Sequence, residues 1–373
     1  MAEVLIVGAG PVGTLLAAEL TRFGVEVEVV ERRATAGGGS RAIGLHAPVL
    51  AALEAGGATE RILSSAVRVR RGEARSDGRT IGVVDFARLD VRHPYVATLA
   101  QAQTEQALRG GGPEPERGVT VTGLHAEAGG VRVETDRGGR RAPIVVLAGG
   151  VGARDLVYRP AALRRTVYAD RYLMTDAAVP PREDAETAVV HLAPGGVLES
   201  FPLPGGRRRF VAWDAGGSVE TRTARLLQAL RERGEAEAAE AVDDATEFGV
   251  KRVLTRAMRR DRLFVIGDAG HEISPIGGQG MNLGLLDAAT LAPLLAAWIR
   301  LGSAPDADLA EWERDRLRSA RTAGRLAAVN MALGRPVSGA VHAARSRVLG
   351  SVLAATGALV PHAYAMGLDR SAR

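Results

Sequence analysis

The sequence predicts an α/β protein in which a Rossmann-like domain carries an inserted, sheet-rich second domain and is followed by C-terminal helices. Two glycine-rich loops predict the Rossmann-like part, because each one follows a short apolar strand and opens a helix, although they lie far apart in the chain. The third observation is a series of strand-like segments between the two loops, which predicts the inserted domain.

The first loop directly follows an apolar, β-branched strand at Val4–Val7 and precedes a helix expected over residues 14–23. Gly8 makes the tight turn in such a unit, Gly10 lets the backbone approach a pyrophosphate, and Gly13 lets the helix pack closely on the strand. The N-terminus of the helix supplies free amides and a partial positive charge. The loop therefore predicts a phosphate-binding turn.

A second strand, expected over residues 25–30, leads to Glu31. A carboxylate at this point can accept hydrogen bonds from a ribose hydroxyl and disfavours a 2′-phosphate. Pro11 and Val12 at the start of the helix and Arg32 after the acid complete the expected binding residues. The βαβ unit predicts a dinucleotide, and by itself it does not separate NAD from FAD.

The second loop follows a buried strand expected over residues 262–266 and contains Asp268 at the end of that strand. Glycines and a proline lead from there to a helix over residues 279–298, with apolar side chains at helical spacing. A carboxylate beside a helix N-terminus suits a polyol chain on the acid and an anionic ring edge on the amides. The two loops together indicate FAD.

These segments resemble the FAD-dependent aromatic hydroxylases, single-component flavoprotein monooxygenases typified by para-hydroxybenzoate hydroxylase. The family pattern is Gly-Asp-Ala-Ala-His, then Pro, then Gly-Gln-Gly-x-Asn, then Asp-Ala, and residues 267–288 match almost throughout. Residues 40–46 and 95–108 resemble family segments that contact the FAD. The expected cofactor-binding residues are Gly8, Gly10, Pro11, Val12, Gly13, Glu31, Arg32, Arg41, Gln101, Asp268, Pro275, Gly278, Gly280, Met281 and Asn282.

The resemblance implies an enzyme that hydroxylates or otherwise oxygenates an aromatic or polyketide-like molecule through a flavin C4a-hydroperoxide, with NADPH or NADH as the transient reductant. It implies an apolar pocket between the flavin and the inserted domain. Pro275, Gly277 and His271 are the residues expected near the reactive edge of the flavin. With the arginine-rich composition, the resemblance also suggests a tailoring enzyme of secondary metabolism, as in antibiotic biosynthesis.

No catalytic acid or base is identifiable from the sequence. His93, Tyr95, His191 and His271 are candidates by residue type alone, and a histidine without a matched partner is more often structural. His46 and His271 fall in segments expected to contact the flavin, which favours a positioning role for both.

One segment departs from the family pattern. The family has a central Gly-x-Asp-Gly-x-x-Ser-x-x-Arg motif, whose aspartate orders the FAD and NAD(P)H sites. The corresponding residues follow a strand at 144–147 and place Val151 at the aspartate, Asp155 at the serine and Tyr158 at the arginine. Three hypotheses follow: a monooxygenase, a related oxidase, dehydrogenase or isomerising enzyme, and a flavin-binding partner protein without turnover.

The predicted FAD-binding domain comprises residues 1–72, 95–160 and 258–300, and the predicted substrate-binding domain comprises residues 73–94 and 161–257. In the inserted domain, strands are expected over 189–192 and 210–213 and one helix over 223–242. Residues 301–373 are expected to form a helical C-terminal region.

The composition excludes several classes of protein. The chain has 373 residues, no cysteine and a net charge of +5. The absence of cysteine excludes disulfides and a thiolate metal site, and no metal-ligand spacing is present. Scattered arginines and 4% aromatic residues argue against nucleic acid. No leader-like segment or uninterrupted apolar span is apparent, so we expect no membrane contact. The absence of cysteine is compatible with a reducing cytosol, and we expect a cytoplasmic protein that is a monomer or a homodimer.

Overall fold

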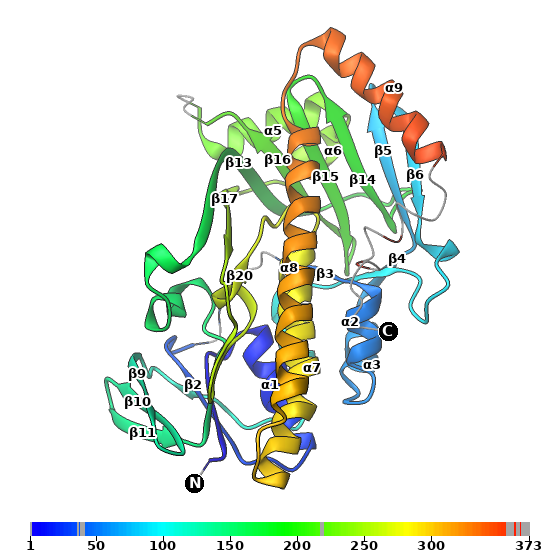
Figure 1. Ribbon diagram of the computed structural model, residues 1–373. Helices are drawn as coiled ribbons and strands as arrows, with labels where there is room; N and C mark the ends of the chain where they lie inside the picture. The colour runs from blue at the N-terminus through cyan, green and yellow to red at the C-terminus, as the bar shows by residue number, and fades with distance from the viewer. Residues whose placement is uncertain are drawn as a thin grey trace.

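The computed structural model describes residues 2–35, 37, 42–216, 220–355, 362 and 366. It contains a six-stranded sheet and an eight-stranded sheet at opposite ends of an elongated molecule, with helices on both (Figure 1). The predicted α/β class, with a Rossmann-like part and a sheet-rich part, is confirmed. The predicted domain boundaries remain our proposal.

The six-stranded sheet has the strand order β18-β19-β12-β1-β2-β8. Its central strands pair in parallel, so their carboxyl ends meet at one edge, where ligands bind in such sheets. The apolar runs that predicted these strands are fully buried, as expected for a sheet covered on both faces. The strands are β1 (Val4–Val7), β2 (Val27–Glu31), β8 (Glu116–Arg117), β12 (Ile144–Leu147), β18 (Arg259–Arg260) and β19 (Leu263–Val265).

Helices cover one face of this sheet and a small antiparallel sheet covers the other. Leu16, Phe264, Leu286 and Trp298 share one apolar core between the sheet and its helices. A second apolar core forms between β12 and the small sheet, whose strand order is β11-β10-β9. The elements are α1 (Pro11–Arg22), α2 (Ala47–Ala52), α3 (Ala58–Leu63), α4 (Gln101–Arg109), α7 (Gln279–Leu301), β9 (Val121–Glu127), β10 (Gly130–Thr135) and β11 (Gly138–Ala142).

The eight-stranded sheet has the order β20-β17-β13-β16-β15-β14-β5-β6. The segment 73–94, which the sequence grouped with residues 161–257, contributes most of the pair β5 and β6, and this pair lies beside β14. Its strands are β5 (Arg71–Ser76), β6 (Arg79–Asp85), β13 (Arg164–Ala178), β14 (Thr187–Ala193), β15 (Gly196–Leu203), β16 (Arg207–Asp214), β17 (Thr246–Leu254) and β20 (His271–Glu272).

The prediction of a single helix over residues 223–242 is wrong. The chain instead forms α5 (Arg222–Glu232) and α6 (Ala236–Ala239), which lie on the far face of the eight-stranded sheet. Gly234 separates them with a φ of 80°, a left-handed conformation that ends a helix and that glycine adopts without steric penalty.

Short elements connect the two large sheets. A strand triplet of order β3-β7-β4 lies next to α2 and α3. One 3-10 turn follows β6, two follow β12 and one follows β19. These elements are β3 (Gly44–Leu45), β4 (Val67–Val69), β7 (Val96–Thr98), η1 (Phe86–Arg88), η2 (Val151–Leu156), η3 (Pro160–Ala162) and η4 (Gly267–Ala269).

Two long helices complete the described chain. Helix α8 (Asp306–Gly334) packs beside α7 and continues alongside the eight-stranded sheet, while α9 (Gly339–Ala355) lies against β6 (Figure 1). The expected helical C-terminal region is therefore present as far as Ala355, and most of the residues beyond it lie outside the described part of the chain.

Helix α7 is long and apolar enough to cross a membrane by length and composition alone. This corrects the expectation that no such run exists. However, 67% of its most apolar window is buried inside the protein, because the helix packs between α1, α2 and α8. A mostly buried core helix of a globular protein has the same composition.

Candidate active site and its cofactor cradle

A cavity of about 1110 Å³ lies between the carboxyl edge of the six-stranded sheet and the near face of the eight-stranded sheet. Pockets for drug-sized ligands commonly measure about 300–1,000 Å³, so this cavity has room for a large ligand. Both glycine-rich loops line it, together with strands β14, β15 and β16 and the end of α8. One continuous space thus connects the two predicted sites.

The first loop combines tight backbone packing with one open position. A Cβ atom on Gly13 would lie 2.0 Å from the Gly8 carbonyl oxygen, and a Cβ on Gly8 would lie 2.6 Å from Gly149. A Cβ on Gly10 would meet nothing within 4 Å. Gly8, Gly10, Pro11 and Val12 line the cavity, whereas Gly13 packs behind them. The open position at Gly10 faces the space where a phosphate would approach.

Glu31 ends β2 at the rim of this loop. Its carboxylate accepts hydrogen bonds from the Ala9 amide at 2.8 Å and from the Arg33 amide and Nε at 2.9 Å each. Burial alone would raise the pKa of Glu31, but these bonds outweigh it and lower the pKa below its ordinary value. A carboxylate has about four acceptor positions, so about one remains for a ribose hydroxyl.

The second loop lies opposite, between β19 and α7. Asp268, Pro275, Gly277, Gly278, Gly280 and Met281 line the cavity. Gly278 precedes the first residue of α7 in a left-handed conformation, so the free amides of the helix start at the cavity wall. The loop therefore presents one carboxylate and a helix N-terminus to the same space.

Asn282 connects this loop to the segment around β3. Its side-chain amide donates to the carbonyl oxygens of Gly44 and Gly278 at 2.8 and 2.9 Å, and its Oδ1 accepts from the His46 amide at 2.9 Å. Asn282 is fully buried. It thus holds two walls of the cavity together from behind and does not face the ligand space with its side chain.

Comparisons with known proteins agree with this geometry. A family model described as an FAD binding domain matches residues 1–327. The 6-methylpretetramide 4-monooxygenase of Streptomyces rimosus is 33% identical, over 96% of this chain and 70% of that protein. The chain belongs to the FAD-dependent monooxygenase family.

Solved structures give the same assignment. The anhydrotetracycline hydroxylase of Streptomyces rimosus is 26% identical with a TM-score of 0.76, covering 98% of this chain and 75% of that one. The p-nitrophenol 4-monooxygenase of Pseudomonas putida has a TM-score of 0.84 at 24% identity and covers 100% and 98%, which is a likeness of fold.

The residues of this monooxygenase fit FAD. The open space at Gly10 suits the pyrophosphate, the remaining acceptor position of Glu31 suits the ribose, and Asp268 lies at the strand end where the ribityl chain would run. Arg32 and Gln101 also line the cavity, and Ala42 donates its amide to the Gln101 side chain at 3.5 Å. Arg41, also expected to bind FAD, lies outside the described residues.

His271 is not at the cavity wall, which corrects its expected place near the flavin edge. Its Nε2 lies 2.6 Å from Asp287, which also accepts from Arg316 at 2.8 Å, and all three side chains are fully buried. Burial alone would raise the pKa of Asp287, but His271 and Arg316 lower it to about 2. Asp287 also accepts from the Gly267 amide at 2.9 Å, so the triad supports the second loop from behind.

The other candidate bases also lie away from the cavity. His93 lies 3.0 Å from the Tyr95 hydroxyl and 2.6 Å from Glu54, so His93 and Tyr95 form a local polar cluster. Neither residue lines the cavity. Val96, which is close to them in sequence, does line the cavity, but His93 and Tyr95 themselves do not reach it.

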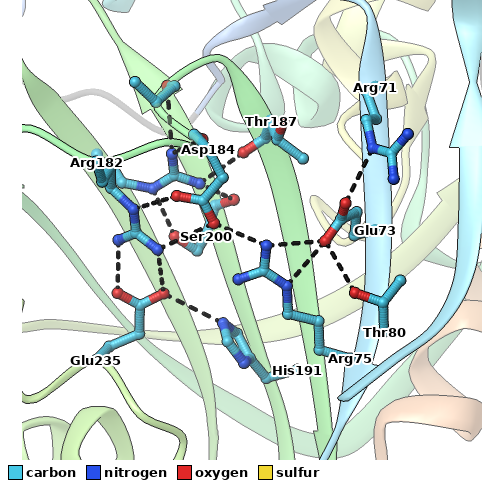
Figure 2. Close-up of polar contacts among 12 residues, drawn as sticks. Arg71, Glu73, Arg75, Thr80, Arg182, Asp184, Thr187, His191, Ser200 and Glu235 are labelled. Carbon is cyan, nitrogen blue, oxygen red and sulfur yellow. Dashed lines mark hydrogen bonds and ion pairs between the residues drawn. The ribbon is translucent and has the colours of Figure 1, made fainter. Parts of the chain in front are cut away.

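His191 lies on the far face of the eight-stranded sheet. Its Nε2 is 3.2 Å from Glu235, within an ion-pair network that includes Arg182 and Asp184 (Figure 2). Its neighbour Val190 lines the cavity. Successive residues of a strand point to opposite faces, so Val190 faces the cavity while His191, the next residue, faces the ion-pair network.

The altered central motif forms the η2 turn. Val151 lines the cavity and its side chain is 46% exposed, so an apolar group faces the space where the family has an aspartate. Asp155, at the serine position, also lines the cavity, while Tyr158 donates its hydroxyl to the Ala257 carbonyl at 2.5 Å.

Arg154 supports the second glycine-rich loop, a contact that the sequence did not reveal. It is 2% exposed, donates to the carbonyl oxygens of Asp268 and Ala269, and lies 3.1 Å from Glu272. It therefore joins the η2 turn to the second glycine-rich loop. Because its partners in the loop at Asp268 and Ala269 are backbone carbonyls, no pairing of charged residues in the sequence could have indicated these two hydrogen bonds.

Proposed function

We propose that this protein uses FAD, NAD(P)H and O₂ to hydroxylate or otherwise oxygenate an aromatic, polyketide-like small molecule. The observation that supports the proposal best is the single cavity, which runs from the two cofactor-binding loops to an apolar sheet face. An aromatic substrate on that face would lie next to the redox cofactor with no further domain between them.

The walls of the substrate end suit an aromatic molecule. Apolar side chains come from four strands of the eight-stranded sheet, namely Val190, Val197, Phe201, Val211 and Phe248. Such walls bury ring surface and exclude water, which protects reactive oxygen chemistry from wasteful hydrolysis or peroxide loss.

The chain's own residues bind and orient the cofactor. Gly10, Glu31 and Asp268 would hold its phosphates, ribose and ribityl chain, and the amides at the start of α7 would stabilise negative charge on its ring. Bound FAD would accept two electrons from NAD(P)H and supply the activated oxygen. Pro275 and Gly277 would border the reacting edge.

The size of the cavity and the relatives' names support a polycyclic substrate. Among the relatives are an anhydrotetracycline monooxygenase and two rifampicin monooxygenases. A cavity of about 1110 Å³ accommodates several fused rings beside a dinucleotide better than a single-ring site would. We therefore favour a tailoring reaction in antibiotic biosynthesis. We also propose a cytoplasmic monomer or homodimer, in keeping with a chain without cysteine that depends on NAD(P)H.

The test is an anaerobic titration of the FAD-loaded protein with NADPH and NADH, followed by addition of O₂. We expect the visible band of oxidised flavin to bleach, faster with an aromatic substrate present, and the oxygenated product to form after O₂ is added. Absence of bleaching by either nicotinamide would overturn a self-reducing hydroxylase.

Val151 supports a second candidate function. An exposed valine replaces the motif's carboxylate, so this position of the cavity wall lacks a charged hydrogen-bond acceptor. A related oxidase, dehydrogenase or isomerising enzyme would not need efficient reduction by NAD(P)H. In the same titration, bleaching by the organic substrate but by neither nicotinamide would favour this second function.

A further inference from the structure

Glu199 is a buried carboxyl group on the substrate face of the eight-stranded sheet. It lies in the middle of β15, lines the cavity and is 8% exposed. Its cross-strand partners are Val190 on β14 and Val211 on β16, which also line the cavity. The alternate residues Val197 and Phe201 on its own strand are apolar as well. Glu199 is thus a carboxyl group whose neighbours across and along the strand are apolar.

Glu199 has no partner among the described residues. Burial raises its pKa to about 7, and no hydrogen bond or ion pair opposes that effect. A buried carboxyl group without a partner destabilises a protein, so such groups are found mainly where a ligand or a reaction requires them.

The neighbouring charged groups are already paired. Arg209 lines the cavity and lies two residues along β16 from Val211, the cross-strand partner of Glu199. Its guanidinium donates two hydrogen bonds to the carboxylate of Asp176, at 2.6 and 2.7 Å. Glu73 on β5 is bound by Arg71 and Arg75. The titratable neighbour Tyr172 on β13 has its pKa raised by burial and, secondarily, by Glu199. In the part of the chain that the structure describes, no cation compensates Glu199.

The two faces of β15 therefore have different roles. On the far face, Ser200 accepts a hydrogen bond from Arg208 at 2.8 Å within the ion-pair network of Figure 2. That network satisfies its own polar groups. On the near face, the carboxyl group of Glu199 is left for a molecule in the cavity.

We propose that Glu199 binds the acidic hydroxyl of a neutral phenolic or enolic substrate and accepts its proton during oxygenation. This inference rests on the proposed function and adds the missing acid–base residue. An unpaired carboxylate in an apolar wall attracts a hydroxyl donor and repels an anionic substrate. A hydroxylated ring without a carboxylate is therefore the substrate class that fits.

The proposed proton transfer is balanced. The substrate O–H bond breaks, its electron pair remains on the oxygen, and the proton forms a new O–H bond on the Glu199 carboxylate. The electron-rich ring carbon then bonds to one atom of O₂, and the other atom leaves as water. NAD(P)H supplies two electrons and one hydrogen as hydride through FAD, and solvent supplies one proton. With the C–H proton that the ring loses, these hydrogens complete the new hydroxyl group and the water, and Glu199 returns its proton to the original oxygen atom of the substrate.

The experiment compares 2-naphthol with naphthalene as probes. Both are aromatic and uncharged over roughly pH 5.5–8.5, and they differ only in the hydroxyl group. Binding to the FAD-loaded full chain is measured by equilibrium dialysis across this range for the wild type, Glu199→Gln and Glu199→Asp. The control is Glu186→Gln, which changes an exposed carboxylate of the same region.

We expect 2-naphthol to bind the wild type on the order of tenfold more tightly above pH 7 than below it, because a charged acceptor makes the stronger hydrogen bond. Naphthalene should show no such tightening. Glu199→Gln should bind 2-naphthol without dependence on pH, Glu199→Asp should restore the dependence, and Glu186→Gln should match the wild type.

Two results would overturn the proposal. One is an equal pH-dependent tightening in Glu199→Gln, and the other is the same tightening for naphthalene, since neither would involve a bond from the hydroxyl to Glu199. Failure of both probes to bind the wild type would count against the aromatic pocket itself and hence against the proposed function as well. Circular dichroism and flavin content establish that each variant is folded and loaded.

Discussion

Glu199 shows how a residue needed for function can reduce stability. Burial raises its pKa to about 7, above a value of about 4.3 in the unfolded chain. Between these values the folded state binds more protons than the unfolded state, so the free energy of unfolding falls as pH rises from about 4.5 to about 7 and then levels off. The penalty is present at neutral and alkaline pH.

We therefore predict that Glu199→Gln is more stable than the wild type at pH 8, by up to about 3 kcal/mol, with the difference disappearing near pH 4.5. Urea unfolding with saturating FAD at the two pH values measures it. Glu186→Gln should change neither value. A difference that is the same at both pH values would show that the effect does not come from ionisation of this carboxyl group.

Asp287 is the opposite case, a buried carboxylate whose partners compensate it. We predict that Asp287→Asn lowers the free energy of unfolding by about 3–5 kcal/mol, because Arg316 and His271 lose the charge that neutralises them. FAD affinity should fall too, since Asp287 also holds the Gly267 amide. Urea unfolding and a flavin-binding titration measure the two effects.

A matched control for this variant is Asp315→Asn. Asp315 pairs with Arg318 on the exposed side of α8, where a surface ion pair contributes about 1 kcal/mol or less. Equal losses in the two variants would mean that the buried triad adds nothing beyond an ordinary surface pair.

At the scale of single elements, the first glycine-rich loop uses different glycines for packing and for ligand binding. We predict that Gly10→Ala leaves the free protein as stable as the wild type within about 0.5 kcal/mol, because its Cβ would meet nothing within 4 Å, yet weakens FAD binding at least tenfold. Gly13→Ala should instead destabilise the free protein, because its Cβ would lie 2.0 Å from a carbonyl oxygen.

Thermal unfolding without FAD, followed by a flavin titration, distinguishes the two effects. If Gly10→Ala bound FAD as tightly as the wild type, the pyrophosphate would not approach this position. If Gly13→Ala were as stable as the wild type, the close helix–strand contact would be able to relax without loss.

The elements around the cofactor were predictable because their signals are local. An apolar strand, a glycine turn and a helix follow one another within a few residues, as at β1 and α1 or at β19 and α7. The helix over residues 223–242 was mispredicted because one glycine, Gly234, outweighed a helix-favouring composition on both sides of it.

The acid–base group was not predictable, because it depends on which face of a strand points into the cavity. His191 and Val190 differ by one position on β14, and Glu199 and Ser200 differ by one position on β15. Strand register, set by pairing with distant segments, decides which of each pair faces the ligand. Residue type favoured the histidines, whereas the tertiary structure places the glutamate at the cavity wall.

At the scale of the whole molecule, α8 connects the two large sheets. Its 29 residues span about 43 Å. Trp312 and Leu317 lie in the core around α7, and Met331 lies in the core of the eight-stranded sheet. Near the end of the helix, a Cβ on Gly334 would lie 2.8 Å from Val197. Separating the sheets would expose both ends of this helix, so we expect them to unfold as one unit.

This coupling predicts that FAD protects the eight-stranded sheet as much as the six-stranded sheet, which carries the cofactor-binding loops. With free FAD at about 100 times its Kd, the slowest-exchanging amides of β15 and β16 should gain about 2.7 kcal/mol of protection, equal to the gain in β1, because all of them exchange through the same global unfolding. Hydrogen-exchange mass spectrometry with and without FAD measures both regions. The Gly10→Ala variant at the same FAD concentration should show a smaller gain everywhere. Protection confined to β1 and α1 would instead show that the two sheets unfold separately and that α8 joins them only loosely.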